Sequence, residues 1–514
     1  MFVGALLACP VCARAAVVAA GLALTSSAAG ESMTTFAPSE AKPCPKVTYS
    51  TGACRIVKNL AYRDLKGCVL DLCHPVGTNG FPTVVWFHGG GLTSGRRDWL
   101  AIDTNRIAVA TVEYRLMPKV GPGDCIDDAA AAAAWVKRHI AEYGGDANLV
   151  FVSGHSAGGY LTFMLGLDGR WLGKYGLTPF DFAGYMPLSG QVTKHFAVRK
   201  HFKHQENAFQ PIIDEWAPLY HLKAQTPPFC VALGDPKVEW KMRAEENWFM
   251  CESLKAMGNR NFEFHSFPGK NHGTCRGPAL GVFQRFVDRI SARLAEPMLL
   301  TLTFDDGTKD HLEVAAPMIE ARGWRGTFNI VTDNVGKKNH LTWDEIRELK
   351  RRGHEIASHT VSHVSLTGLL KRGDTNEVHR QYRESRDAIR RELGEAPRFM
   401  CHPYVAFDET TDALCREDGM TPMSPRRHNF GHGTKAGTAS GIGAAIVRWR
   451  AEGRRAQDVL MHGVCPGGGW HPFDSKEDFA AFLDEIRERE KRGEVKVVPY
   501  SEFMSALARE PEFW

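Results

Sequence analysis

Short apolar segments alternate with longer segments of helical period along most of the chain. In the first half, apolar runs of strand length predict buried strands at 83–88, 107–114, 149–153, 229–233 and 262–267. Acidic residues open segment 127–139 and basic residues close it, which predicts a helix, and 279–294 predicts a closing amphipathic helix. Strands that alternate with helices are typical of a parallel sheet.

The same alternation starts again in the second half of the chain. Thr342 and Glu345 form a capping box before a helix that should end at Gly353. Further strands are predicted at 299–304, 459–461 and 495–498, and further helices at 377–393 and 476–492. The change falls near Glu296-Pro297, with almost no linker. We therefore expect two α/β domains, at 45–295 and 297–514.

The first 29 residues predict a secretory signal peptide. They contain no acid and one base, Arg14, followed by an apolar run at 15–24 and small residues up to Ala29. Cleavage after Ala28 or Ala29 would give a secreted or periplasmic protein. A membrane anchor needs about 20 apolar residues, and Arg14 interrupts this stretch. No stable membrane span is expected, although an uncleaved surface anchor is an alternative.

Composition excludes several classes of protein. Hydrophobic residues make up 43% of the chain, which is enough for buried cores and excludes general disorder. Lys and Arg number 63 against 59 Asp and Glu, without a dominant basic block, so no nucleic-acid partner is expected. Cysteines at 44, 54, 68 and 73 could form disulfides in an oxidising compartment, but their pairing cannot be deduced from the sequence.

Ser156 is the candidate nucleophile of the first half. It lies in Gly154-His155-Ser156-Ala157-Gly158, between the strand at 149–153 and the apolar run at 160–167. A strand, a sharp turn and a helix form the context of a nucleophile elbow. His88-Gly89-Gly90-Gly91 ends an earlier strand. The amides of Gly89, Gly90 and Ala157 could therefore face a developing oxyanion.

A histidine and an acid should complete this site from later strand ends. His272 follows the strand at 262–267 and is the candidate base. The acid should follow the preceding strand, where Asp235 is our assignment and Glu239 is its rival.

The order Ser156, Asp235, His272 is the α/β-hydrolase order, and residues 45–295 resemble that superfamily. The segments His88–Gly91, Tyr114–Pro118 and Gly154–Gly159 are similar to those of esterases that include acetyl xylan and feruloyl esterases. The resemblance implies an α/β-hydrolase fold and a Ser-His-Asp acyl-enzyme mechanism without a cofactor. Many relatives carry the acid as G-x-x-D, a position that Lys237 occupies here.

The second half carries a candidate metal centre. Asp305 and Asp306 close the strand at 299–304, where one carboxylate could bind a cation and the other take a proton from water. His359 and His363 are four residues apart and could present two nitrogens to one ion. Asp306, His359 and His363 would then leave coordination positions open for water and substrate.

These motifs resemble the polysaccharide deacetylase (NodB-like) family, carbohydrate esterase family 4, over about 298–505. The family motifs are T-F-D-D-G, here 303–307, and H-(S/T)-x-x-H, here 359–363. The resemblance implies a distorted (β/α)₇ barrel, Asp305 as base, and Asp306, His359 and His363 as ligands of a divalent metal, usually zinc. His462, in Val459-Leu460-Met461-His462, would protonate the departing amine or alcohol.

The chain departs from this family at two places. The usual F-R-P-P-Y motif is here Met400-Cys401-His402-Pro403-Tyr404, so Cys401 stands in the position of the arginine that pairs with the base. Arg398 is a candidate substitute. No D-x-x-D-W motif follows Gly419.

The sequence therefore predicts a secreted bifunctional carbohydrate esterase that removes acyl groups, acetyl above all, from polysaccharide. One domain would form an acyl-enzyme on Ser156, and the other would use metal-activated water. The alternative is a serine esterase whose C-terminal barrel binds sugar without turning it over. A lipid or peptide substrate for the first domain is a third possibility.

Overall fold

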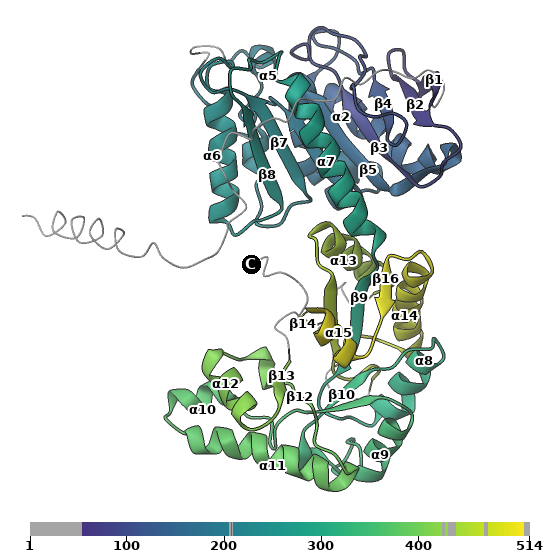
Figure 1. The fold of residues 1–514 in the computed structure, drawn as a ribbon, viewed down its shortest axis with the longest axis vertical. Coiled ribbons are helices and arrows are strands. Elements are labelled where there is room, and N and C mark those ends of the chain that lie inside the picture. Colours follow the sequence, from purple (N-terminus) through teal and green to yellow (C-terminus); the bar gives the residue numbers. More distant parts are fainter. Residues whose placement is uncertain are drawn as a thin grey trace, which may run out of the picture. The chain divides into compact units, whose positions relative to one another are not determined.

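The computed structural model places the strands in two separate sheets (Figure 1). It describes residues 54–507 apart from 205, 206, 208, 424–426, 430–437 and 467–470. The predicted signal peptide and Cys44 therefore lie outside the described residues. Within them, no helix is both long and apolar enough to cross a membrane.

The first sheet has the order β1-β2-β4-β3-β5-β6-β7-β8. Its strands are β1 Cys54–Ala61, β2 Val69–Pro75, β3 Phe81–Phe87, β4 Ala108–Val112, β5 Gly145–His155, β6 Gly184–Leu188, β7 Phe229–Gly234 and β8 Phe262–Phe267. The β1–β2 and β2–β4 pairs are antiparallel and all later pairs are parallel. This is the mostly parallel sheet expected of the α/β-hydrolase fold.

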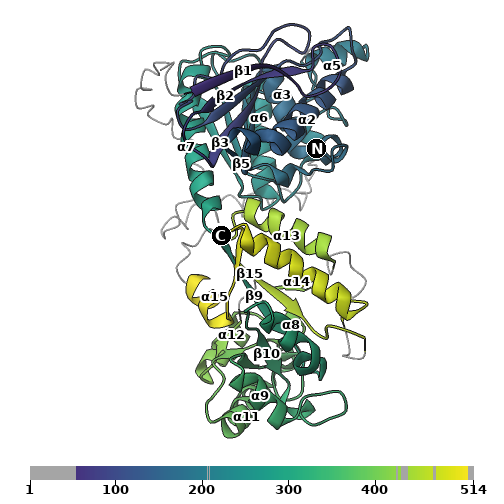
Figure 2. The ribbon, with the colours of Figure 1, turned by 90° about the vertical axis from the view of Figure 1, so that its right-hand side faces the viewer.

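Helices cover both faces of this sheet (Figure 2). They are α2 Pro122–His139, α3 Ala157–Leu167, α4 Gly169–Gly173, α5 Phe196–His201, α6 Arg243–Ala256 and α7 Arg276–Ala295. Val85 and Phe87 of β3 pack in the core with α2 and α3, whereas Val84 and Trp86 pack with α7 on the other face. Both faces of the parallel strands are thus apolar, which explains why these strands appear in the sequence as continuous hydrophobic runs.

The second sheet consists of parallel strands in the order β13-β12-β11-β10-β9-β15-β14, with β16 beside β9. Its strands are β9 Met298–Phe304, β10 Thr327–Ile330, β11 Glu355–Ser358, β12 Phe399–Met400, β13 Thr421–Pro422, β14 Arg427–Asn429, β15 Ala456–Met461 and β16 Val495–Val497. Its helices are α8 Ala316–Glu320, α9 Trp343–Arg351, α10 Leu366–Lys371, α11 Thr375–Leu393, α12 Glu409–Glu417, α13 Ala439–Ala451, α14 Lys476–Lys491 and α15 Tyr500–Leu507. The described strands thus form an incomplete barrel that is open between β13 and β14.

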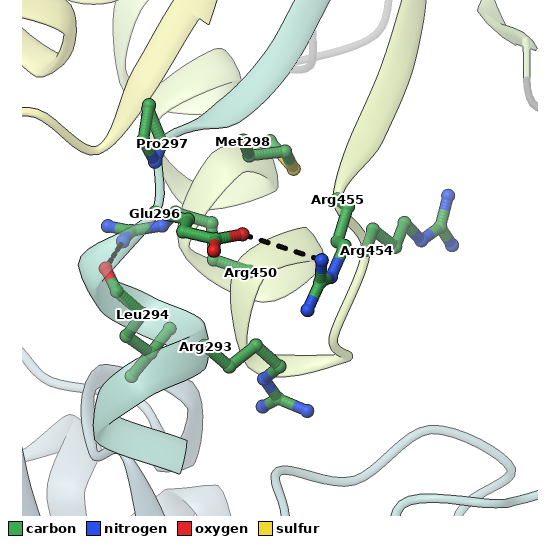
Figure 3. Close-up of a pocket in the computed structure, with 8 residues that line it drawn as sticks. All are labelled: Arg293, Leu294, Glu296, Pro297, Met298, Arg450, Arg454 and Arg455. Atoms are coloured by element: carbon green, nitrogen blue, oxygen red, sulfur yellow. Dashed lines mark hydrogen bonds and ion pairs between the residues drawn. The ribbon is translucent and has the colours of Figure 1, made fainter. Parts of the chain in front are cut away.

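Only Glu296 and Pro297 separate α7 from β9 (Figure 3). Glu296 forms an ion pair with Arg455 at 3.4 Å, and Arg450 donates a hydrogen bond to the carbonyl of Leu294. These residues belong to the lining of a small cavity formed by Arg293, Leu294, Glu296, Pro297, Met298, Arg450, Arg454 and Arg455.

Among the described cysteines, Cys54, Cys68 and Cys73 are free thiols.

Candidate active sites

Ser156 lies at a sharp turn between β5 and α3. Its backbone has φ 57° and ψ −113°, a strained conformation that places the residue between strand and helix. A Cβ at Gly158 would lie 2.0 Å from the carbonyl oxygen of Phe87, and one at Gly154 would lie 2.5 Å from the backbone of Gly158. The glycines of the motif are therefore required by backbone contact.

Ser156 opens into a cavity of about 320 Å³ in the first domain. The lining residues are Gly89, Gly90, Gly91, Thr93, His155, Ser156, Phe196, Trp240 and His272. A Cβ at Gly89 would lie 3.4 Å from Ser156 Cβ, so the glycine backbone runs beside the nucleophile. Ala157 is the first residue of α3, where amides have no acceptor within their own helix. The three predicted oxyanion residues thus lie around Ser156.

His272 is held by Glu239. His272 Nδ1 donates to Glu239 Oε1 at 2.7 Å, because a carboxylate accepts. This leaves Nε2 with its lone pair, and Nε2 is buried without a hydrogen bond to any described residue. Burial raises the pKa of Glu239, but hydrogen bonds from His272 and the Trp240 amide outweigh it and lower the pKa to about 2. Glu239 is therefore a carboxylate at neutral pH.

The assignment of the acid to Asp235 is wrong. Its carboxylate accepts hydrogen bonds from the amides of Lys237 at 2.9 Å and Gly269 at 2.7 Å, and so organises a turn. The backbone then makes a helical turn, in which the Glu239 amide donates to the Asp235 carbonyl. That turn returns Glu239 to the end of β7, where Glu239 Oε2 also accepts from the Gly234 amide at 3.1 Å.

Two further residues position His272. The ring of Trp240 stacks on that of His272 with a centroid separation of 3.8 Å. His155 Nε2 donates to the His272 carbonyl at 2.7 Å, and burial together with His272 lowers the pKa of His155 to about 4. Neither role is predicted from the sequence, although Trp240 is adjacent to Glu239 and His155 to Ser156.

The second candidate site lies at the carboxyl ends of the barrel strands. Asp305 and Asp306 follow β9, His359 follows β11, and His462 follows β15. His359 Nε2 lies 3.7 Å from Asp306 Oδ1, and His363 Nε2 lies 3.5 Å from the same oxygen. The structure therefore brings together the predicted ligand set.

The geometry of these residues fits a divalent cation. The Cys401 carbonyl accepts a hydrogen bond from His359 Nδ1 at 2.8 Å, which leaves Nε2 as the nitrogen with a lone pair. His359 Nε2 is buried and has no hydrogen-bond partner among the described residues. Burial lowers the pKa of His363, and His359 and His462 act in the same direction. Two imidazole nitrogens beside a carboxylate are a donor set that can hold a divalent transition metal.

Asp305 lies next to this ligand set. Asn329 of β10 donates from Nδ2 to Asp305 Oδ1 at 2.6 Å, and Cys401 Sγ lies 3.6 Å from Asp305 Oδ2. Arg398 instead packs its guanidinium over the ring of Phe399. The role of Asn329 is not among those predicted from the sequence, although a lone amide in the short apolar strand Thr327–Ile330 is a signal of a special role.

His462 joins the site through the pairing of β15 with β9. Met461 is opposite Phe304 in that pair, and the Asp305 amide donates to the Met461 carbonyl at 2.9 Å. The residues that follow these strands, Asp305 and His462, thus lie at the same edge of the sheet. The carbonyl of His462 accepts a hydrogen bond from His311 Nε2 at 2.8 Å, which anchors its backbone.

Two parts of the chain are similar to two different families of known proteins. Residues 70–175 match the sequence model of the BD-FAE family, and residues 294–423 match that of the polysaccharide deacetylase family. The Mycobacterium tuberculosis "Carboxylesterase NlhH" is 37% identical over 106 residues, which are 19% of this chain and 33% of that protein. The Bacillus subtilis "Putative polysaccharide deacetylase YxkH" is 26% identical over 139 residues, which are 27% of this chain and 46% of that protein.

The chain thus spans less than half the length of each of these curated relatives. A solved structure described as "Truncated form of carbohydrate esterase from gut microbiota" covers 49% of this chain and 100% of its own, with 16% identity and a TM-score of 0.39. Both family matches agree with the resemblances inferred from the motifs. The chain joins a region that matches the BD-FAE family of α/β-hydrolase esterases to a region that matches the polysaccharide deacetylase family.

Proposed function

We propose that the chain is an exported carbohydrate esterase with two independent hydrolytic centres, both acting on acylated polysaccharide. The observation that carries the proposal is that each sheet gathers candidate catalytic residues at the carboxyl ends of its parallel strands: Glu239 bonded to His272 on the first sheet, and the possible metal ligands Asp306, His359 and His363 on the second. The family matches support hydrolysis of esters and amides by these regions. Export rests on the sequence of residues 1–29.

In the first centre, Ser156 Oγ attacks the acyl carbonyl and His272 Nε2 takes its proton. Glu239 holds the His272 Nδ1–H and stabilises the imidazolium that forms. The amides of Gly89, Gly90 and Ala157 stabilise the developing oxyanion. The alcohol leaves with the proton from His272, and water then hydrolyses the acyl-enzyme with the same histidine as base.

In the second centre, Asp306, His359 and His363 would hold a divalent cation, which we propose to be zinc. A bound ion would supply Lewis acidity toward a carbonyl oxygen. Asp305 takes the proton of the attacking water, and the hydrogen bond from Asn329 orients its carboxylate. His462 gives a proton to the departing amine or alcohol.

The deciding experiment measures acetate release from acetylated xylan and from N-acetylated glycans. Ser156→Ala should lower ester hydrolysis by about 10⁶ in turnover when a chelator silences the barrel, because the nucleophile is lost. Acetate release from the N-acetylated substrate should persist in this variant without chelator. Wild-type esterase activity of Ser156→Ala in chelator would refute the serine mechanism. Absence of acetate release from both glycan classes by Ser156→Ala without chelator would leave the barrel as a sugar-binding module.

A further inference from the structure

Cys401 places a thiol inside the second centre. The residue follows β12, and its side chain is buried, with 0% of the residue exposed. Its Sγ lies 3.6 Å from Asp305 Oδ2. The resemblance to polysaccharide deacetylases implies a positively charged arginine at this position. Here a thiol takes its place, so a side chain that can bind a metal cation replaces one that carries a positive charge.

The donor atoms of this centre form two overlapping sets. The atoms of Asp305, His359 and Cys401 all lie within 4.8 Å of one another, and so do those of Asp306, His359 and His363. Both sets include His359, and because its Nδ1 donates to the Cys401 carbonyl, Nε2 is the nitrogen whose lone pair either set would use. That nitrogen lies 3.8 Å from Asp305 Oδ2 and 3.7 Å from Asp306 Oδ1.

We propose that Asp305, His359 and Cys401 form a second metal-binding set, which takes thiophilic divalent ions such as cadmium and competes with the first set. Thiolate is a soft ligand, so it favours such ions over magnesium or calcium. When the sulfur–metal bond forms, the thiol proton leaves to solvent. An ion bound here occupies the Asp305 carboxylate and shares His359, so it blocks the base that we propose for deacetylation. The inference therefore rests on the proposed function of the barrel site.

Another thiol-containing group offers a matched control. Cys230, Glu263 and His265 also lie within 4.8 Å of one another by their donor atoms. There, however, Glu263 already forms an ion pair with Arg289 at 3.0 Å. A guanidinium beside the carboxylate repels a second cation, so this group should not bind the ion.

The test is titration of the full chain with cobalt(II), followed by its thiolate-to-cobalt charge-transfer absorption in the near ultraviolet. The wild type should show this band, and Cys401→Ser should lose it. Cys230→Ser should keep the band, and His363→Ala should keep it too, because the sulfur set does not use His363. Cadmium should displace the cobalt responsible for the band. Far-ultraviolet circular dichroism and thermal unfolding of each full-length variant report that it is folded.

A band that is unchanged in Cys401→Ser, or the absence of a band in the wild type, would overturn the inference. Failure of the proposed function gives a different result. If Cys401→Ser binds no cobalt while the wild type shows the band, the sulfur set exists and the set of Asp306, His359 and His363 does not bind. If Cys401→Ser binds cobalt without the band, both sets are supported.

Discussion

At the scale of single residues, one hydrogen bond determines which nitrogen of a histidine is available in each centre. A carboxylate accepts from Nδ1 of His272, and a backbone carbonyl accepts from Nδ1 of His359. Both partners are acceptors, so the proton lies on Nδ1 and the lone pair on Nε2 in each case. The lone pair on Nε2 of His272 suits proton transfer, and the lone pair on Nε2 of His359 suits metal binding.

Glu239→Gln should lower the turnover of ester hydrolysis by about 10⁴, because the amide cannot hold His272 in its working tautomer. Asp235→Asn is the matched control and should change turnover little, since Asp235 organises a turn. Steady-state kinetics with p-nitrophenyl acetate in the presence of chelator measure both variants. A larger loss in Asp235→Asn than in Glu239→Gln would return the catalytic acid to Asp235.

His359→Ala combined with His363→Ala should abolish metal binding by the first set, whereas Asp305→Asn should keep the metal and lose glycan deacetylation. Imidazoles bind metal in their neutral form, which dominates above a pKa of about 6.5. Burial lowers the pKa of His363, so affinity should fall only as the pH drops below that value. Metal analysis and binding isotherms from pH 8 to pH 5 check this. Equal metal content in wild type and double-histidine variant would exclude the site.

At the scale of elements, the turn from β5 to α3 places the nucleophile by bringing a helix into contact with a neighbouring strand. Gly158 on α3 meets the carbonyl of Phe87 at the end of β3 so closely that a methyl group has no space. The same contact sets the distance between Ser156 and the glycines that follow β3. We therefore expect this contact between α3 and β3 to affect both the stability and the activity of the domain.

Gly158→Ala should destabilise the first domain by at least about 1–3 kcal/mol, because the added methyl group forces α3 away from β3. Esterase activity should fall with it. Gly277→Ala adds the same group to α7 at a position with open space, where Ala in place of Gly should stabilise a helix by up to about 1 kcal/mol. The thermal unfolding midpoints of the two variants are compared with that of the wild type, with loss of esterase activity on heating as the signal. Equal midpoints for Gly158→Ala and wild type would refute the contact argument.

At the scale of the whole molecule, the two candidate centres lie in one chain but share no residue. The proposed serine set lies on the sheet of β1–β8 and should need no ion, whereas the second set lies on the sheet of β9–β16 and consists of residues that could hold a metal ion. Both would remove acyl groups from a polymer, which makes their fusion chemically coherent. Inhibitors that act on serine or on metal should therefore separate the two activities.

Chelation should abolish acetate release from N-acetylated glycans and leave p-nitrophenyl acetate hydrolysis by Ser156 intact. A serine-reactive phosphonate should do the reverse, because it forms a covalent bond with the Ser156 hydroxyl. The test measures acetate release from N-acetylated glycans and hydrolysis of p-nitrophenyl acetate with each reagent separately. Ser156→Ala is the control, because it has no hydroxyl for the phosphonate to modify. Loss of both activities to one reagent would indicate a single active centre.

Much of this protein follows from local sequence. The strand at Phe262–Phe267 agrees with the predicted range, and the capping box of Thr342 and Glu345 is present before α9. Ser156 and the His359–His363 pair were found because their chemistry depends on neighbours within a few residues. The parallel sheets could be predicted because strands buried on both faces leave apolar runs that are visible in the sequence.

Only the tertiary structure decided which acid serves His272 and what surrounds Asp305. Asp235 and Glu239 follow the same strand, and the turn after Gly234 determines which carboxylate reaches the histidine. Asn329 of β10 and Cys401, which follows β12, contact Asp305 across sequence separations of 24 and 96 residues. Local pattern identifies the groups that can do chemistry. Contacts between strands that are distant in the chain determine their partners, because those contacts exist only after the sheet has formed.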